Sequence, residues 1–493
     1  MPDEDNRVII VGGGPAGLML ACELSLAGTR AVVLEKRNQR AQRSTGGLLH
    51  PSCIDAFNQR GWAERFRTEE TPKWNRTHFG LIYTELTEAW AEKESYFLVP
   101  QWKTEQVLEE IASELGAEIR LGVEVIGIRQ DKSGVTARIR AANGDEEMDG
   151  AYLVACDGAR SPVAEYAQFE YDVLAPSYYG MTADFPTTGS EAANFETGLY
   201  PGGQFGVLPY SEDYTRFMTI EFTGEPQGAE TPVTTEEIRD SIQRVTGKCP
   251  ELGTPLFSRR YGNPTKLARS YRDRRVFLVG DAAHAHPPHS GDGLVTAIHD
   301  AVNLGWKLAA VMRGNSSHPL LDSYHVERYP VGRRACVRAH AQIPLMHPLD
   351  HAKSLREIFT ELMAFENVRQ YLIEYTTQVR YPIGYPERPF TLDSHPLLGA
   401  RFPDVAVKTL HGKHRVSELM HSGHGVLLML SGNQSRSPEL GDLSNMIDTV
   451  AALPAADIDA KTLLIRPDGI IAWADRSGTD DTGLLAAAKA WFG

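Results

Sequence analysis

The chain has 493 residues, of which 42% are hydrophobic and 23% are charged, a balance typical of globular proteins. At about 100–200 residues per domain, this length predicts between two and four domains. The formal net charge of −14 repels phosphate backbones, so it argues against nucleic-acid binding.

The cysteines and the N-terminus predict a cytoplasmic protein. The five cysteines are scattered and form no CxxC motif, which indicates reduced thiols and not a disulfide framework. The opening MPDEDNRVII is acidic, whereas a signal peptide begins with a basic region. No run of about 20 uncharged apolar residues occurs, so we expect no transmembrane helix and no membrane association.

A strand, a glycine-rich turn, a helix and a second strand open the chain. Residues 7–11 and 31–35 are apolar and predict strands, and residues 15–27 have helical spacing. The turn contains Gly12, Gly14 and Gly17 in the pattern G-x-G-x-x-G, which brings a pyrophosphate to the start of a helix. Glu35 ends the second strand, where a carboxylate can accept hydrogen bonds from a ribose. This context predicts a dinucleotide site.

The middle of the chain predicts a further strand and then a different module. Residues 106–113 predict a helix, and residues 123–128 and 135–140 predict strands. Another short strand at 152–155 is followed by Asp157 and Gly158. From about 165 to 270 the chain is rich in Tyr, Phe, Gly and Pro, with strands at 205–209 and 216–222 and a helix at 235–245. We therefore expect an inserted antiparallel sheet.

A second Asp-containing strand end appears late in the chain. The buried strand 276–280 runs into Gly280 and Asp281, and ligands bind at the carboxyl ends of strands in open α/β sheets. Helices are expected at 300–312 and through 318–380. Four prolines within 382–396 indicate a linker. Beyond it, strands at 425–430, 462–465 and 470–474 and a helix at 483–491 predict a small α/β domain.

The order of these three signals resembles the FAD-dependent aromatic hydroxylases of the p-hydroxybenzoate hydroxylase type. The resemblance implies non-covalent FAD, with the mid-chain Asp-Gly near the pyrophosphate and Asp281 near the ribityl chain. It extends to the VPQWKTE segment with Gln101 and to the Pro288–Leu294 region beside the flavin ring. The residues that we expect to bind FAD are Gly12, Gly14, Pro15, Ala16, Gly17, Glu35, Lys36, Arg43, Gln101, Asp157, Gly158, Gly280, Asp281, Pro288, Gly291, Asp292, Gly293 and Leu294.

Two departures from the family pattern concern the flavin. Asp292 stands where the family has a neutral amide, and Val295 stands where it has an Asn. A carboxylate about 5 Å from an anionic reduced flavin would repel it by roughly 3 kcal/mol at an effective dielectric near 20, and by little if it pointed into solvent. Near the cofactor phosphates, Thr45 replaces a basic residue, for which Arg43 is the expected substitute.

The last part of the chain resembles the thioredoxin-like extension of the subgroup that hydroxylates aromatic polyketides. Residues 345–493 contain no cysteine, so this extension cannot perform dithiol chemistry, and a packing or dimer role is expected. The predicted fold class is α/β. The predicted domains are an FAD-binding Rossmann-like domain (1–75, 100–165 and 270–345), an antiparallel substrate domain (76–99 and 166–269), a helical linker (346–395) and a thioredoxin-like domain (396–493).

The predicted function is monooxygenation of a polyketide-type natural product with NAD(P)H and O2. The alternative is a non-redox cyclase of the decalin-forming [4+2] type, in which FAD is structural. Candidates for the substrate pocket are Tyr179, Phe205, Tyr210 and Phe217, although such aromatics also fill cores. The sequence identifies no catalytic base. We expect no metal, since His284, His286 and His289 complete no usual ligand set, and we expect a monomer or homodimer.

Overall fold

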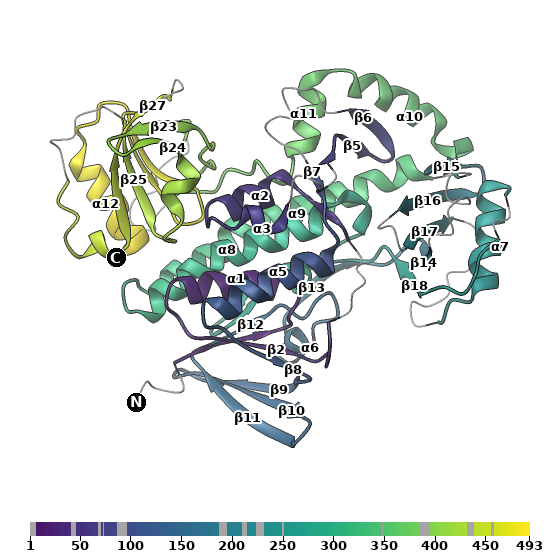
Figure 1. Cartoon of the computed structure of the whole chain (residues 1–493), viewed down its shortest axis with the longest axis horizontal. Coiled ribbons are helices and arrows are strands. Elements are labelled where there is room, and N and C mark those ends of the chain that lie inside the picture. Colours follow the sequence, from purple (N-terminus) through teal and green to yellow (C-terminus); the bar gives the residue numbers. More distant parts are fainter. Residues whose placement is uncertain are drawn as a thin grey trace.

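A six-stranded sheet forms the centre of the computed structural model (Figure 1). The structure describes residues 6–40, 46–67, 71, 73–85, 96–186, 195–209, 214–222, 231–248, 251–347, 349–383, 395–430, 438–454 and 458–493. In sheet order, the strands are β20 (Arg272–Asp273), β21 (Val276–Leu278), β12 (Tyr152–Ala155), β1 (Val8–Val11), β2 (Ala31–Glu35) and β8 (Glu118–Leu121). Every strand pair is parallel except β20 with β21.

The central strands are apolar throughout because both faces of the sheet are covered. β1, β2, β12 and β21 are buried at every residue. Helix α1 (Pro15–Leu26) packs between α5 (Gln101–Glu114) and α8 (Asp292–Met312) on one side. On the other side lies an antiparallel sheet of β9 (Glu124–Gln130), β10 (Val135–Ala141) and β11 (Gly144–Gly150) (Figure 1).

Parallel register brings three strand ends to one edge of the sheet. Val11 pairs with Ala155, and Ala155 pairs with Leu278. The three glycine- and aspartate-containing turns that follow these strands therefore lie side by side. In open α/β sheets, ligands bind at this edge, the carboxyl ends of the strands.

A second, five-stranded antiparallel sheet stands apart from the first. Its order is β15 (Gly198–Tyr200), β16 (Gly203–Pro209), β17 (Tyr214–Glu221), β14 (Tyr179–Pro186) and β18 (Phe257–Gly262). Helix α7 (Thr235–Thr246) covers one face, where Ile238 and Ile242 join an apolar cluster. On the opposite face, Ile220 packs with Tyr178 and with Ile343 of α9 (Pro319–Met346).

Smaller elements join these layers. They are α2 (Pro51–Asn58), α3 (Ala63–Phe66), α6 (Pro162–Tyr166), the sheet β3 (Leu48–Leu49), β7 (Tyr96–Leu98) and β4 (Lys73–Trp74), the hairpin β5 (Arg76–Phe79) and β6 (Ile82–Glu85), and the sheet β13 (Tyr171–Leu174), β19 (Thr265–Ala268) and β22 (His284–Ala285). Helices α10 (Leu349–Met363) and α11 (Glu366–Glu374) follow α9. None of the helices in the described chain is both long and apolar enough to cross a bilayer.

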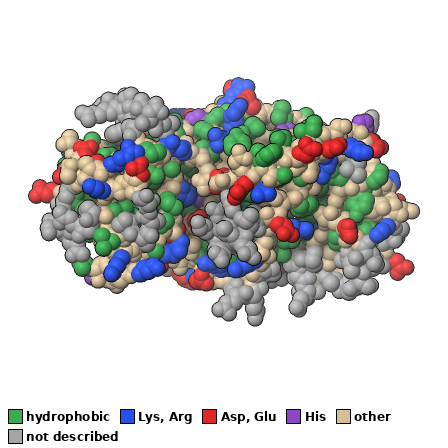
Figure 2. Space-filling view, turned by 90° about the horizontal axis from the view of Figure 1, so that it is seen from above, with side chains coloured by type: hydrophobic (Ala, Val, Ile, Leu, Met, Phe, Trp, Pro, Cys, Tyr) green, Lys and Arg blue, Asp and Glu red, His purple; other side chains and the backbone are tan. Residues whose placement is uncertain are grey.

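The C-terminal domain lies at the opposite end of the molecule from the five-stranded sheet (Figure 1). Its larger sheet has the order β26 (Ile447–Ala451), β25 (Gly425–Met429), β28 (Thr462–Ile465) and β29 (Ile471–Asp475), and helix α12 (Asp481–Phe492) packs on it. A smaller sheet joins β24 (Gly412–Arg415), β23 (Ala406–Thr409) and β27 (Leu453–Pro454). The face in Figure 2 carries acidic, basic and hydrophobic side chains interspersed.

Several elements differ from their predicted bounds. Helix α5 begins at Gln101, five residues before the predicted start, because Pro100 is its N-cap residue. Helix α8 begins at Asp292 and not at residue 300, since Gly291 turns the chain directly into it with φ of 74°. Strand β11 was not predicted: five of its seven residues are exposed, so it lacks an apolar pattern.

Candidate functional site

The glycine-rich turn after β1 leaves space where a pyrophosphate is expected. A Cβ atom on Gly12 would lie 2.3 Å from the Cys156 carbonyl oxygen, and one on Gly17 would lie 2.0 Å from the Gly12 carbonyl oxygen. A Cβ atom on Gly14 would meet no heavy atom within 4 Å. Gly12 and Gly17 are thus required by close packing, whereas Gly14 borders open space at the start of α1, beside Pro15 and Ala16.

Glu35 is held in place as the expected ribose ligand. The side chain is buried, and its carboxylate accepts a 2.9 Å hydrogen bond from the Gly13 N–H and another of 2.9 Å from the Arg37 N–H. Burial alone would raise the pKa of Glu35, but the Arg37 side chain and these N–H groups hold it below its usual range. The carboxylate is therefore ionised at neutral pH. Lys36 beside it is exposed.

Arg40 is a basic residue at this loop that the sequence reasoning missed. Its guanidinium donates to the Gly13 carbonyl oxygen and contacts Glu109 on α5. Its Nη2 is buried and has no hydrogen-bond partner in the described part of the chain. A donor in this position suits a phosphate oxygen. The expected phosphate ligand Arg43, like Thr45, lies outside the described residues.

The segment with Gln101 and the turn after β12 also border the site. The Gln101 N–H donates to the Gly46 carbonyl oxygen, and its side-chain amide donates to Glu105 at 2.9 Å. In the turn after β12, Asp157 accepts from the Val163 N–H at 3.2 Å, and burial raises the pKa of Asp157. Gly158 has φ of 85° and faces space free of heavy atoms within 4 Å of its absent Cβ.

The turn after β21 that carries Gly280 and Asp281, which we call the late motif, lies close to the start of α8. Gly280 has a φ of 64°, and a Cβ atom there would lie 3.5 Å from the Ala16 Cβ atom, so this turn adjoins the first one. Asp281 is exposed, and its Oδ1 lies 3.8 Å from the position of a Cβ atom on Gly293. Pro288 begins a short 3-10 helix, and Gly291 opens onto empty space before Gly293 and Leu294.

Asp292 does not point into solvent, which corrects one of the two alternatives drawn from the sequence, and its charge is paired. It is 3% exposed and accepts hydrogen bonds of 2.9 and 2.8 Å from Arg338 and one of 2.8 Å from Thr376. Burial alone would raise the pKa of Asp292, but the Arg338 guanidinium holds it below its usual range. Because a buried carboxylate requires a partner, the loop carries a compensated charge.

The structure does not support a pocket role for two of the aromatic candidates. Phe205 and Phe217 are buried to 0% and 3% exposure in the layer between the five-stranded sheet and α7. Alternation along β14 gives Tyr179 the same side of the sheet as Met181 in that cluster. Tyr210 lies outside the described residues. A sequence shows which residues share a face, but not which face a later helix covers.

The three histidines that precede α8 each have a different hydrogen-bond partner. His284 bonds Asp300 at 2.6 Å, His286 bonds the Pro287 carbonyl oxygen, and His289 bonds the Ala339 carbonyl oxygen. Across the described ranges, no group of three His, Cys, Asp or Glu residues could hold a metal ion. These side chains support the loop through hydrogen bonds.

Together, the described residues fit FAD. Gly14, Gly158 and Gly291 face free space along one edge of the sheet, and Arg40 offers an unused buried donor. Gly293 and Leu294 begin a 21-residue helix, where backbone N–H groups lack intrahelical acceptors. The assignment of individual FAD ligands stays a prediction.

Comparisons with known proteins agree with this geometry. Residues 5–339 match the FAD binding domain family, and residues 395–493 match the family "aromatic-ring hydroxylase, C-terminal". The chain is 38% identical to a rifampicin monooxygenase of Streptomyces venezuelae, with 99% of this chain and 98% of that protein aligned. It is 36% identical to a dialkyldecalin synthase of Streptomyces rugosporus, with 99% of each aligned.

A solved structure extends the similarity to three dimensions. The anhydrotetracycline hydroxylase OxyS from Streptomyces rimosus superposes with a TM-score of 0.89 at 33% identity, and 99% of each chain is covered. The relatives thus include a monooxygenase, a hydroxylase and a dialkyldecalin synthase. The sequence matches, the similar structures and the fit to FAD lead to one conclusion: the chain belongs to the FAD-dependent aromatic-ring hydroxylase family.

Proposed function

We propose that this enzyme is an FAD-dependent monooxygenase that hydroxylates a polyketide-type natural product with NAD(P)H and O2. The observation that carries the proposal is the Asp292–Arg338 pair. An unpaired carboxylate at this loop would oppose negative charge on a reduced flavin, whereas the paired one leaves the loop near neutrality. The acidic residue at this position therefore gives no electrostatic reason against a redox role for the flavin.

The residues of this chain would hold the cofactor and stabilise charge. The Gly12–Gly17 turn and Arg40 would receive the phosphates, and Glu35 the adenosine ribose. The first N–H groups of α8 would face the anionic form of the ring. When bound, reduced FAD supplies the reactivity with O2 that oxygen transfer to an electron-rich ring requires. The protein's contribution is to bind, orient and exclude water.

We propose that the substrate contacts the face of the five-stranded sheet opposite α7. Register places Gly180, Thr182 and Met218 on this face, together with Tyr261. A Cβ atom on Gly180 would lie 2.5 Å from the Tyr261 ring, so the glycine allows that ring to lie over the sheet. The Thr182 hydroxyl is buried and lacks a hydrogen-bond partner among the described residues, which leaves it available to a ligand.

We also propose the predicted division into domains, with a thioredoxin-like C-terminal domain that has a packing role. Its sheet order and the absence of cysteine from 345–493 support this.

We propose a cytoplasmic location, which is supported by the described cysteines, since they are all free.

The second candidate function is a flavin-dependent cyclase. It is favoured by the 36% identity to a dialkyldecalin synthase over 99% of the chain. In such an enzyme, the protein would fold a linear substrate, and proximity and orientation could contribute roughly 7–11 kcal/mol. FAD would then serve as a wall of the cavity.

Stopped-flow measurement of flavin reduction by NADPH separates the two functions. Anhydrotetracycline and rifampicin serve as probes of the polyketide class. In a monooxygenase, the flavin absorbance near 450 nm should fall within about a second to a few seconds, and a suitable probe should make this reduction faster. O2 should then be consumed as hydroxylated product forms. A flavin that neither NADPH nor NADH reduces under any of these conditions would contradict the proposal and leave the cyclase.

A further inference from the structure

Residues 375–383, which we call the strap, connect α11 to the C-terminal domain and lie along α8 and α9. The strap is fastened at its far end to the C-terminal domain: the Tyr381 N–H donates to the Gly399 carbonyl oxygen at 2.8 Å. Arg380 donates to the Leu398 carbonyl oxygen at 2.7 Å. These contacts fix the far end of the strap to the C-terminal domain.

The first part of the strap contacts residues 288–294, which we call the flavin loop. Thr376 is 4% exposed, and its hydroxyl donates to the Asp292 carboxylate at 2.8 Å. Asp292 is the first residue of α8, directly before Gly293. The same carboxylate accepts from Arg338, which also donates to the Ser290 carbonyl oxygen at 2.8 Å. Thr376 thereby completes the set of donors that holds the loop.

The last part of the strap contacts the late motif through α9. The Tyr381 hydroxyl accepts a 2.6 Å hydrogen bond from Arg328, which donates to Asp300 at 2.6 Å. The other oxygen of Asp300 accepts from the Gly280 N–H at 3.1 Å and bonds His284 at 2.6 Å. A continuous chain of buried hydrogen bonds therefore joins Tyr381 to the turn that carries Asp281.

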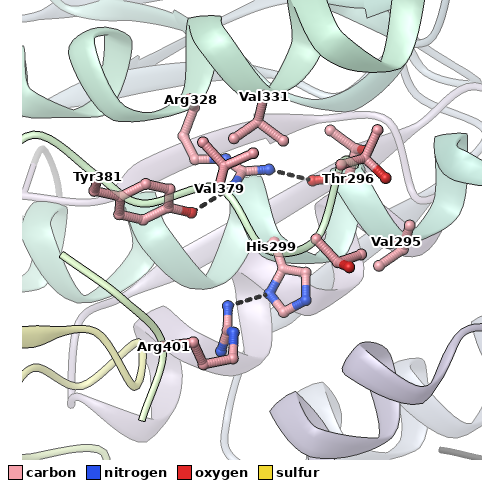
Figure 3. A pocket seen from close by; sticks show the side chains of 10 residues that line it. Val295, Thr296, His299, Arg328, Val331, Val379, Tyr381 and Arg401 are labelled. Carbon is pink, nitrogen blue, oxygen red and sulfur yellow. Dashed lines mark hydrogen bonds between the residues drawn. The ribbon is translucent and has the colours of Figure 1, made fainter. Parts of the chain in front are cut away.

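Between these two contacts, the strap faces one side of α8 at close range. Val295, Thr296 and His299 of α8 face Tyr381 and the rest of the strap around a small cavity (Figure 3). His299 bonds Arg401 of the C-terminal segment at 3.0 Å. The cavity leaves free volume for about one water molecule. The strap and α8 are therefore separated by at most one small cavity.

We propose that the strap positions both flavin-binding loops, with Thr376 and Tyr381 as the positioning residues. Thr376 acts on the flavin loop through Asp292, and Tyr381 acts on the late motif through Arg328 and Asp300. The role goes beyond the proposed reaction, since it applies equally to a hydroxylase and to a cyclase. It gives the C-terminal domain, which has no cysteine, a function in flavin binding.

The test compares Thr376→Val and Tyr381→Phe with wild type, using full-length protein freed of FAD and titrated with FAD. Each variant should raise the Kd for FAD roughly threefold to tenfold, the effect of one lost hydrogen bond between positioning groups. In Thr376→Val, the flavin midpoint potential should also fall, because the Asp292 charge is less neutralised. Thr376→Ser keeps the hydroxyl and should restore both values.

Gln378→Ala and Tyr375→Phe are matched controls from the same strap, because Gln378 is exposed and the Tyr375 ring packs against Tyr371 and Arg334. They should leave the FAD affinity and potential unchanged. An unchanged FAD Kd and potential in both test variants would overturn the proposal. So would a lower unfolding temperature of the apoprotein without any change in FAD binding. Neither readout depends on NADPH or substrate, so this test and the reduction experiment can fail independently.

Discussion

The FAD-binding region meets its two neighbours through chemically different interfaces. Toward the C-terminal domain, it buries charge: Arg466 bonds Glu327 of α9 at 2.6 and 2.9 Å, and Arg60 bonds Glu23 and the Pro467 carbonyl oxygen. Toward the five-stranded sheet, it buries apolar side chains around Ile220 and Ile343.

The difference matters because hydrogen-bonded charges tolerate displacement less well than apolar contacts do. A buried ion pair requires specific geometry, whereas apolar groups of similar volume can repack. The C-terminal interface therefore fixes one arrangement. The sheet interface, where the proposed substrate face lies, allows adjustment to ligands of different shape.

The charged interface can be broken at Arg466. Arg466→Met leaves Glu327 and Asp468 buried without their main counter-charge, so we expect the free energy of unfolding to fall by about 3–5 kcal/mol. Urea denaturation followed by tryptophan fluorescence measures it. Arg476→Met, which breaks the exposed pair with Asp459, should change little. Similar urea midpoints for the two variants would show that the buried cluster does not stabilise the contact between the C-terminal domain and the FAD-binding region.

A substitution at Gly14 tests FAD binding without disturbing either interface. Gly14→Val places a side chain in open space, so the fold should be kept while stoichiometric FAD binding is lost. Absorbance of purified protein and its unfolding temperature report the two properties. A variant that retained one FAD per chain would remove this turn from the pyrophosphate site.

The electrostatic role of the flavin loop can be tested at Asp292. Asp292→Asn leaves Arg338 less compensated, so the flavin midpoint potential should rise by about 20–45 mV, which corresponds to roughly 1–2 kcal/mol. Arg338→Met should shift it in the opposite direction, and the double variant should return toward wild type. Spectroelectrochemical titration measures all three. A potential that neither substitution moves would place the pair out of electrostatic range of the ring.

The smallest effect, a dependence on pH, should come from His289 at the sheet interface, where its ring bonds the Tyr178 hydroxyl at 3.3 Å. Burial lowers the pKa of His289 to about 4, below its unfolded value of about 6.5. The unfolded chain therefore binds more protons between these values, and stability falls as pH decreases from 6.5 toward 4. His289→Gln should reduce that loss by roughly 1 kcal/mol per pH unit. Equal slopes of unfolding free energy between pH 6 and 5 would contradict a neutral buried His289.

Local patterns predicted several buried strands at their observed positions. β2, β12 and β28 have the predicted bounds, because short buried strands are continuous apolar runs. The motif order predicted the family and FAD. The pairing of Asp292 with Arg338 spans 46 residues, and no local pattern encodes which of many arginines folds back onto a loop. Arg40 was missed for the same reason, since its contact with Gly13 depends on the path of the intervening chain.

The buried cluster at Arg466 also bears on how such enzymes exchange parts in evolution. Asn303, Lys307 and Glu327 belong to the FAD-binding region, whereas Arg466 and Asp468 belong to the C-terminal domain. A recombination event between relatives that joined mismatched halves would strand ionised groups in the interior. Productive chimeras should therefore inherit both sets from one parent, and these positions should limit where crossovers survive.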